Sequence, residues 1–200
     1  PPPRTEQGHI EAAREALIVA MLPHVPFDGW SNEAIAMALE DSGVDAGLAR
    51  LALARGGIDA AMAFHRRRDR AMSQTLAAAP LASMKIREKV TLAVRTRLEI
   101  AEPDREAVRR GAALLALPIH AAEGARAVWG TADAIWSALG DESRDINWYS
   151  KRATLSLKSL EFPVMAVAPC GVMRSGRPER GRPAKSSGAV DTGAMRCYIA

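Results

Sequence analysis

The chain has 200 residues, of which 48% are hydrophobic and 25% are charged, a composition typical of a globular protein. No stretch approaches the roughly 18 uncharged apolar residues that a membrane-spanning helix needs, and residues 1–17 do not resemble a secretory signal. Cys170 and Cys197 have neither metal-ligand spacing nor the pattern of a disulfide framework. We therefore expect no spanning helix, no signal peptide and no structural metal.

The net charge of +4 is concentrated at the end of the chain. Residues 163–200 contain six Lys and Arg against two Asp and Glu, so the basic and acidic residues of 1–162 cancel. A sequence pI of about 9.4 would otherwise suggest nucleic-acid binding. Because the body is neutral, the pI gives no support to a DNA-binding function.

Helical signals recur along the chain, and alanine is abundant whereas strand formers are scarce. Ser31 and Asp45 are placed to cap helices at their N-termini, Pro103 suits a first helical position, and Gly140 suits a helix end. Short connections separate the segments, which predicts an all-α bundle. The expected helices are 10–22, 31–43, 45–57, 58–80, 82–102, 103–118, 120–140 and 145–160.

Residues 163–200 are rich in Pro, Gly, Ser and Arg and lack helical periodicity. Such a composition cannot bury enough apolar surface to offset chain entropy, so we expect a disordered basic tail. The predicted organisation is therefore residues 1–80 as a helix-turn-helix region with its connecting helix, 81–162 as a second helical region, and 163–200 as the tail.

Residues 31–63 resemble the helix-turn-helix of TetR-type repressors in the order and length of their helices. The second of these helices, however, opens on Asp45 and offers only small or apolar residues before Arg50, its first base. A recognition helix needs polar or basic residues near its N-terminus to reach base edges and phosphates. DNA binding by a TetR-type regulator therefore stays open only as the alternative function.

Catalytic and metal-binding patterns are missing from the sequence. The four histidines are scattered, and no Ser or Cys stands in a recognisable nucleophile context. The densest basic run, residues 65–70 (HRRRDR), fans around most of a helix, and we expect it to form a solvated face. These features predict a protein that is not an enzyme, with no catalytic residues, no cofactor and no metal.

Aromatic residues are the more informative signal, because the chain has only nine of them. Trp129 and Trp136 lie seven residues apart along one predicted helix. Trp148 and Tyr149 are adjacent, so their side chains point about 100° apart on a helix, and charged residues follow at once. We expect one of these two rings to meet solvent, a lipid or a partner, since aromatic residues beside arginine are typical of interface hot spots.

The segment ADAIWSALGDESRDINWYSKRA, residues 132–153, resembles the hallmark of the coenzyme Q nine family of ubiquinone-biosynthesis accessory proteins. KIREKVTLAVRTRLE and EAVRRGAALLALP resemble the preceding helices of that family, in the same order. The resemblance covers roughly residues 10–160. It implies an all-α, TetR-like helical bundle whose N-terminal helix-turn-helix is degenerate.

The resemblance also implies a function. Such proteins bind lipid without catalysing a reaction, enclose an apolar cavity for an isoprenoid quinone intermediate or phospholipid, and support the di-iron demethoxyubiquinone hydroxylase. The family's surface for lipid and partner matches one cluster of residues here: Trp136, Asp145, Ile146, Asn147, Trp148, Tyr149 and Arg152. The implied location is the cytoplasm or the cytoplasmic membrane face in a bacterium, and the matrix side in a mitochondrion.

The end of the chain departs from the family pattern. After Pro163 the sequence lacks the last amphipathic helix by which the family docks on a membrane, and the last two helices, through which TetR-like proteins form homodimers, are altered or missing. We hypothesise a frameshift, a truncation or a genuine divergence. Membrane docking and homodimer formation are therefore expectations of the family that residues 163–200 put in doubt.

Overall fold

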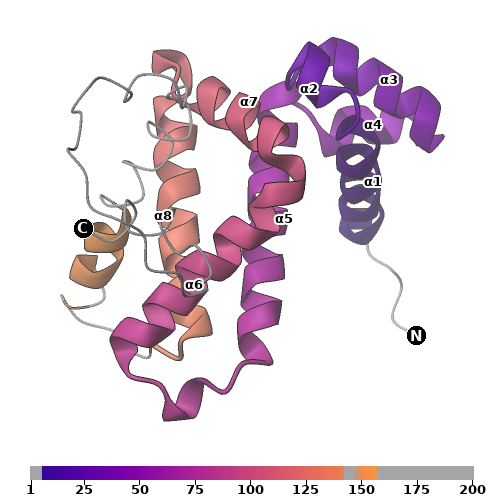
Figure 1. The fold of residues 1–200 in the computed structure, drawn as a ribbon. Helices are drawn as coiled ribbons and strands as arrows, with labels where there is room; N and C mark the ends of the chain where they lie inside the picture. Colours follow the sequence, from indigo (N-terminus) through magenta and orange to yellow (C-terminus); the bar gives the residue numbers. More distant parts are fainter. Residues whose placement is uncertain (1–5, 142–146, 148, 157–200) are drawn as a thin grey trace, which may run out of the picture. The chain divides into compact units, whose positions relative to one another are not determined.

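The computed structural model describes residues 6–141, 147 and 149–156, and every structural statement below refers to these residues (Figure 1). They belong to the first of two units into which the chain divides, residues 1–168 and 169–200. The predicted tail, residues 163–200, lies outside the described part.

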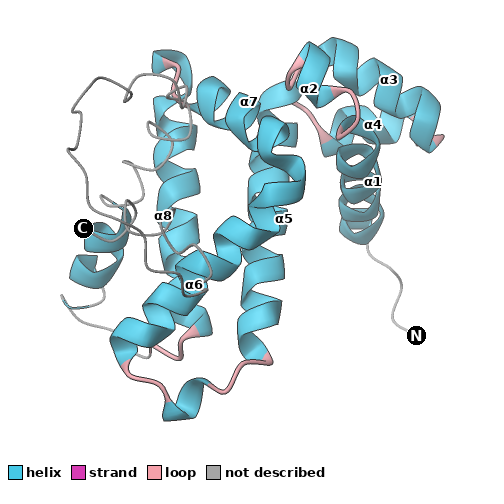
Figure 2. Cartoon of the chain, in the orientation of Figure 1, coloured by secondary structure: helices cyan, strands magenta, loops and turns pink. Residues whose placement is uncertain are grey.

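The predicted all-α class is confirmed, because the described residues form helices and no strands (Figure 2). None of these helices combines the length and the apolar character that crossing a membrane requires. Residues 149–156 are also helical. The α-helices are α1 Glu6–Met21, α2 Val25–Asp28, α3 Asn32–Ser42, α4 Ala46–Ala52, α5 Gly57–Ala77, α6 Ile86–Ala101, α7 Arg105–Leu115 and α8 Ala121–Ala138, with 3-10 turns at Leu81–Ser83, Glu102–Asp104 and Pro118–His120.

The N-terminal helices pack around α1, whose Leu17, Ile18 and Met21 are almost fully buried. Both α3 and α4 lie against this helix. The predicted N-caps are confirmed: the Ser31 hydroxyl accepts a hydrogen bond from Ala34 N at 3.2 Å, and Asp45 Oδ1 accepts one from Leu48 N at 2.9 Å. The identity of this region as a degenerate helix-turn-helix stays a prediction.

Trp30 joins the N-terminal helices to the rest of the structure. Its indole is buried and donates a hydrogen bond from Nε1 to the carbonyl of Ala107 in α7 at 3.0 Å. The ring centroid lies 4.9 Å from that of Phe64 in α5. A methyl group on Gly57 would lie 1.9 Å from the Trp30 carbonyl oxygen, so α5 can begin here only with a glycine.

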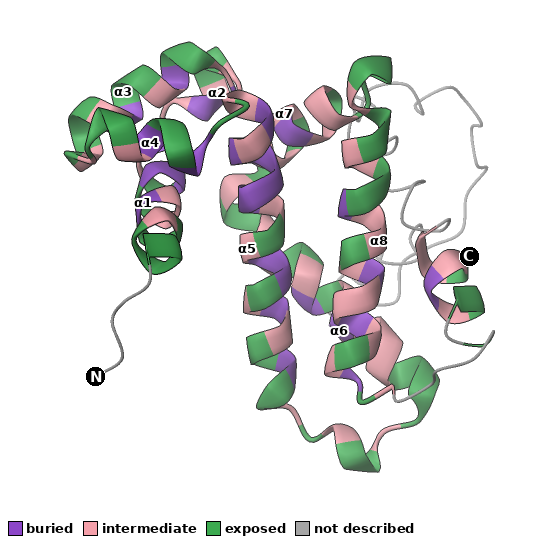
Figure 3. Ribbon diagram, turned by 180° about the vertical axis from the view of Figure 1, so that it is seen from behind, coloured by how far each residue is buried: buried purple, intermediate pink, exposed green. Residues whose placement is uncertain are grey.

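The long helix α5 is shared by two apolar clusters, and buried residues run along much of its length (Figure 3). Its first half packs in the N-terminal cluster with α1, α3 and α4. Its second half contributes Met72 and Leu76 to a cluster with α6 and α8, which supply Ala93, Ile135 and Leu139. Because α5 also packs extensively on α6 and α8, it is the central element of the described bundle.

Several predicted helix boundaries are wrong by a few residues. The short helix α2 was not expected, and α6 begins at Ile86 rather than Ala82, where the Glu88 carboxylate accepts a hydrogen bond from the Lys85 backbone N–H at 2.8 Å. Pro103 lies in a 3-10 turn, so it is not the first residue of α7. At the start of α6 a capping hydrogen bond, which the composition of a segment does not reveal, sets the helix end.

The prediction that residues 65–70 form a solvated face is wrong for Arg68 and Asp69, which are 4% and 6% exposed. Asp69 Oδ1 accepts a hydrogen bond from Arg97 Nε at 2.8 Å, and both its oxygens lie 3.1 Å from the Thr131 hydroxyl. His65 Nε2 lies 2.8 Å from the same hydroxyl. These contacts connect α5, α6 and α8 through a buried polar network, which a run of basic residues does not reveal.

Candidate functional site

The candidate site begins where α8 ends. Asp141 N donates to the carbonyl of Trp136 at 3.0 Å, and Gly140 N donates to that of Ser137 at 3.1 Å. Gly140 has a φ of 77°, in the left-handed region that favours glycine. This pair of bonds is a Schellman motif, and it places the predicted helix stop Gly140 just beyond the C-cap Leu139. The motif also fixes the position of Asp141.

Arg152, in the helical segment 149–156, pairs with two carboxylates near the end of α8. Its Nε donates to Asp133 Oδ1 at 2.6 Å, and its Nη1 donates to Asp141 Oδ2 at 3.1 Å. The Arg152 side chain is only 2% exposed and that of Asp141 7% exposed, whereas that of Asp133 is 46% exposed. A buried charge must be paired to be tolerated, so these two bonds attach the segment to α8.

Lys151 adds a second connection between the segment and α8. Its Nζ lies 2.8 Å from Asp141 Oδ1 and 5.4 Å from the centre of the Trp136 ring. An ammonium at that distance from an indole is attracted by the electrons of the ring. Trp136 is half-buried, and its Nε1 is buried without a hydrogen-bond acceptor among the described residues. The indole therefore packs under the segment rather than standing on the surface.

Tyr149 is the exposed aromatic residue of the segment, with 62% of its surface accessible. Asn147 is also exposed, and its carbonyl accepts a hydrogen bond from the Ser150 hydroxyl at 3.1 Å. On the other side of the segment, Leu155 packs against the apolar cluster of α6 and α8. The segment thus presents an aromatic ring to solvent while ion pairs and an apolar contact hold its inner side.

The seven predicted site residues divide into four groups. Asn147 and Tyr149 lie on the surface, and Trp136 lies half-buried beneath Lys151. Arg152 does not lie on the exposed surface, because its guanidinium is enclosed by Asp133 and Asp141. Asp145, Ile146 and Trp148 lie outside the described residues. A binding role for the whole set stays a prediction.

Sequence reasoning missed the residues that hold the site together. Asp133, Asp141 and Lys151 belong to the stretch that resembles the family, but no pattern identified them as partners of Arg152 and Trp136. Asp133 and Asp141 are eight residues apart and lie on either side of a helix end. Only the Schellman turn brings the second carboxylate back toward the same arginine, and Gly140 is the sequence signal for that turn.

The site offers recognition chemistry rather than reactive groups. Within the described part of the chain, no three His, Cys, Asp or Glu side chains are grouped so that they could hold a metal ion. The arrangement instead combines an exposed phenol, a half-buried indole and a paired lysine. Aromatic rings with polar tips and neighbouring cations suit the boundary between an apolar ligand or partner and water.

The fold and this surface define an all-α protein with an exposed aromatic residue on a helical segment near the end of its described residues. A sequence model of the COQ9 family matches residues 121–157, which include α8 and the whole segment. The family resemblance that the sequence predicted is thereby confirmed, and it extends well beyond the matched residues.

Two curated relatives illustrate that extent. The chain is 29% identical over 155 residues to the Ubiquinone biosynthesis protein COQ9, mitochondrial, of Drosophila melanogaster, which covers 76% of this chain and 47% of the relative. It is 28% identical over 171 residues to the protein of the same name from Homo sapiens, covering 78% of this chain and 54% of the relative. The chain thus spans about half the length of the curated relatives it matches.

Proposed function

We propose that this protein acts in ubiquinone biosynthesis as a non-catalytic accessory protein that binds lipid. In this proposal it presents polyisoprenoid intermediates to the demethoxyubiquinone hydroxylase, or supports that enzyme by direct contact. The similarity to proteins named for ubiquinone biosynthesis supports the pathway. As those relatives are named mitochondrial, we propose a place on the matrix side in a eukaryote and on the cytoplasmic membrane face in a bacterium.

The observation that carries the proposal is the exposure of Tyr149 on an anchored segment. At 62% exposure most of this large ring is accessible to a partner, and the buried Arg152 fixes the backbone that carries it. A pre-positioned aromatic side chain loses little conformational entropy on binding, which suits an interface anchor. The segment also lies inside the region that matches the family.

Co-purification with the hydroxylase tests this surface. A tagged chain and its Tyr149→Lys variant are expressed with the hydroxylase, and the captured enzyme is quantified. We expect the variant to bind the enzyme about thirtyfold more weakly, since loss of a tyrosine hot spot costs about 2 kcal/mol. Thr154→Lys is the matched control, because Thr154 is exposed on the same helical segment and receives the same charge.

Equal capture by the wild type and by Tyr149→Lys would contradict the proposed surface. An equal loss with Thr154→Lys would also contradict it, because added positive charge alone would then explain the effect. Circular dichroism of both variants checks that the helices are retained.

A TetR-type DNA-binding function is less well supported. Asp45 caps α4 at the end where a recognition helix would enter the groove, and its carboxylate would repel phosphate. The first basic residue of α4 is Arg50, in its last turn. Salt-dependent binding to a duplex from its own promoter would favour the regulator over the accessory protein.

A further inference from the structure

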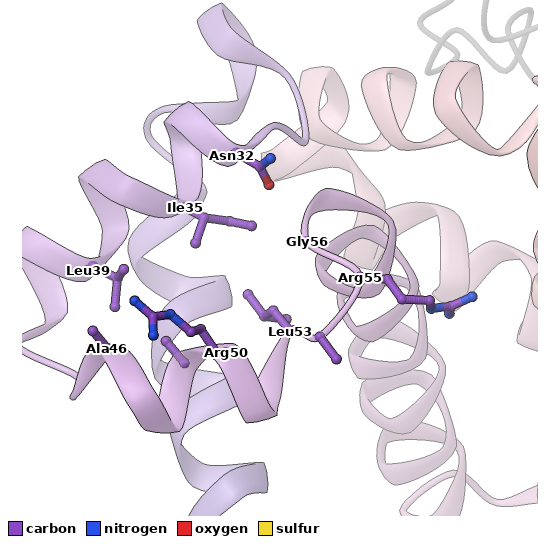
Figure 4. A pocket seen from close by; sticks show the side chains of 10 residues that line it. Asn32, Ile35, Leu39, Ala46, Arg50, Leu53, Arg55 and Gly56 are labelled. Atoms are coloured by element: carbon purple, nitrogen blue, oxygen red, sulfur yellow. The ribbon is translucent and has the colours of Figure 1, made fainter.

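A cavity of about 530 Å³ lies between α3 and α4, on elements separate from α8 and the Tyr149 segment (Figure 4). Its volume falls within the range of about 300–1,000 Å³ that is common for small-molecule sites. Much of its lining is aliphatic, with Ile35 and Leu39 from α3 facing Ala46, Ala49 and Leu53 from α4 and its C-cap.

The cavity follows from how these two helices pack. Each lies against α1, whereas direct packing between α3 and α4 is sparse. Ala46 and Ala49 are too small to fill the space that this arrangement leaves. Ala49 and Leu53 are buried while Ala46 is exposed, so the cavity has an apolar floor and an accessible edge. A cavity with an apolar floor and polar residues along its lining suits a ligand with an apolar body and a polar head.

Two arginines line the cavity, and within the described part of the chain Arg55 has charge partners whereas Arg50 does not. Arg55 donates hydrogen bonds to Asp59 Oδ1 at 2.8 and 2.9 Å and to Glu123 Oε1 at 2.7 Å, and its side chain points away from α3. Arg50 is exposed and extends toward Leu39 (Figure 4). Among the described residues, none forms an ion pair with Arg50. Its guanidinium is therefore available to an anion at the edge of the cavity.

We propose that this cavity binds a single-chain anionic lipid of the fatty-acid class. The carboxylate head accepts hydrogen bonds from the Arg50 guanidinium, whose planar donors match a carboxylate. The alkyl chain lies along Ile35, Leu39 and Leu53 and removes their apolar surface from water. This site is separate from the proposed contact surface around Tyr149, and it does not depend on the proposed function.

Calorimetric titration with dodecanoate, below the concentration at which it forms micelles, tests the site. We expect saturable binding of one dodecanoate to the full chain. Arg50→Gln should weaken it about tenfold, because a charge-assisted hydrogen bond is lost. The matched control is Arg87→Gln, which removes an exposed arginine from α6 and should leave the affinity unchanged. Acetate, which carries the head without the chain, should not bind measurably.

A second variant tests the cavity itself. Ala46→Trp places an indole at the exposed edge and should abolish dodecanoate binding while the helical circular dichroism signal is retained. Equal affinity of the wild type, Arg50→Gln and Ala46→Trp would overturn the proposal. Binding only to vesicles containing phosphatidylglycerol, with none to monomeric dodecanoate, would also overturn it, because the site would then recognise a membrane surface.

Discussion

Arg152 Nε donates a hydrogen bond to Asp133 Oδ1 at 2.6 Å, which joins the helical segment 149–156 to α8. The same guanidinium reaches Asp141, so a single arginine bridges two carboxylates that lie on either side of a helix end. The exposed ring of Tyr149 stands one turn earlier on this segment. The orientation of the proposed contact surface thus depends on a buried charge.

Replacing Arg152 with methionine should release the segment from α8. The change removes Arg152 as a cationic partner of the buried Asp141 and should lower the free energy of unfolding by about 3 kcal/mol. Hydrogen exchange of the amides of residues 150–156 should become faster than in the wild type, because local opening is the first consequence.

The control for this change is Arg126→Met on α8. The Arg126 side chain is 69% exposed and pairs with Glu123, so its loss should cost well under about 1 kcal/mol. Unchanged exchange of residues 150–156 in Arg152→Met would contradict the anchoring role of the arginine.

Two glycines provide a matched test of the packing at the start of α5. Gly57→Ala places a methyl group 1.9 Å from the Trp30 carbonyl oxygen, and we expect the protein to lose several kcal/mol of stability or to fail to fold. Gly130→Ala lies within α8 with no atom within 4 Å of the new methyl group, and should stabilise by about 1 kcal/mol. Urea unfolding measures the stability of both variants. Equal changes in the free energy of unfolding would contradict the close contact between Gly57 and the Trp30 carbonyl.

The buried network around His65 should make stability depend on pH. Burial lowers the pKa of His65 below its ordinary value near 6.5, against the opposing effect of the Asp69 carboxylate, and Arg97 lowers that pKa further. The unfolded chain therefore binds a proton at higher pH than the folded protein does. The folded state is therefore favoured while His65 is uncharged. The stability gained in this way is fully present above about pH 7, and it is lost as the pH falls through 6.5 toward the lowered pKa of His65.

Denaturant unfolding at a series of pH values measures this dependence. His65→Gln should flatten the decline of stability below about pH 7, since glutamine does not titrate. His9→Gln, which changes an exposed histidine on α1, should preserve the decline. An identical pH dependence in the wild type and His65→Gln would contradict the assignment of this effect to the half-buried His65.

The fold class could be predicted from the sequence because helix caps and breakers are local signals. Ser31 and Asp45 cap helices as their positions predict, since each acts on an amide three residues away. The burial of Arg68 and Asp69 could not be predicted, because their partners Asp104 and Arg97 are more than 25 residues distant along the chain. Tertiary contacts, rather than composition, decide which charges are buried.

In the candidate site, too, local features could be predicted from the sequence, whereas features that depend on tertiary contacts could not. The adjacency of Trp148 and Tyr149 indicated that one ring is exposed, and Tyr149 is exposed in the structure. The buried position of Arg152 could not be predicted from the sequence. An arginine close after Trp148 and Tyr149 has the pattern of an exposed interface, so it was expected on the surface. Its burial depends on the turn at Gly140, which brings Asp141 into place. Asp145, Ile146 and Trp148 lie outside the described residues, so their roles stay predictions.

Mass spectrometry of organic extracts of the purified protein tests the central claim most directly. The protein is produced in a host that makes ubiquinone, purified without detergent and extracted alongside an unrelated helical protein of similar size. The accessory-protein account predicts that an isoprenoid quinone intermediate or a phospholipid is enriched in its extract at close to one molecule per chain. An extract indistinguishable from that of the unrelated protein would contradict the account.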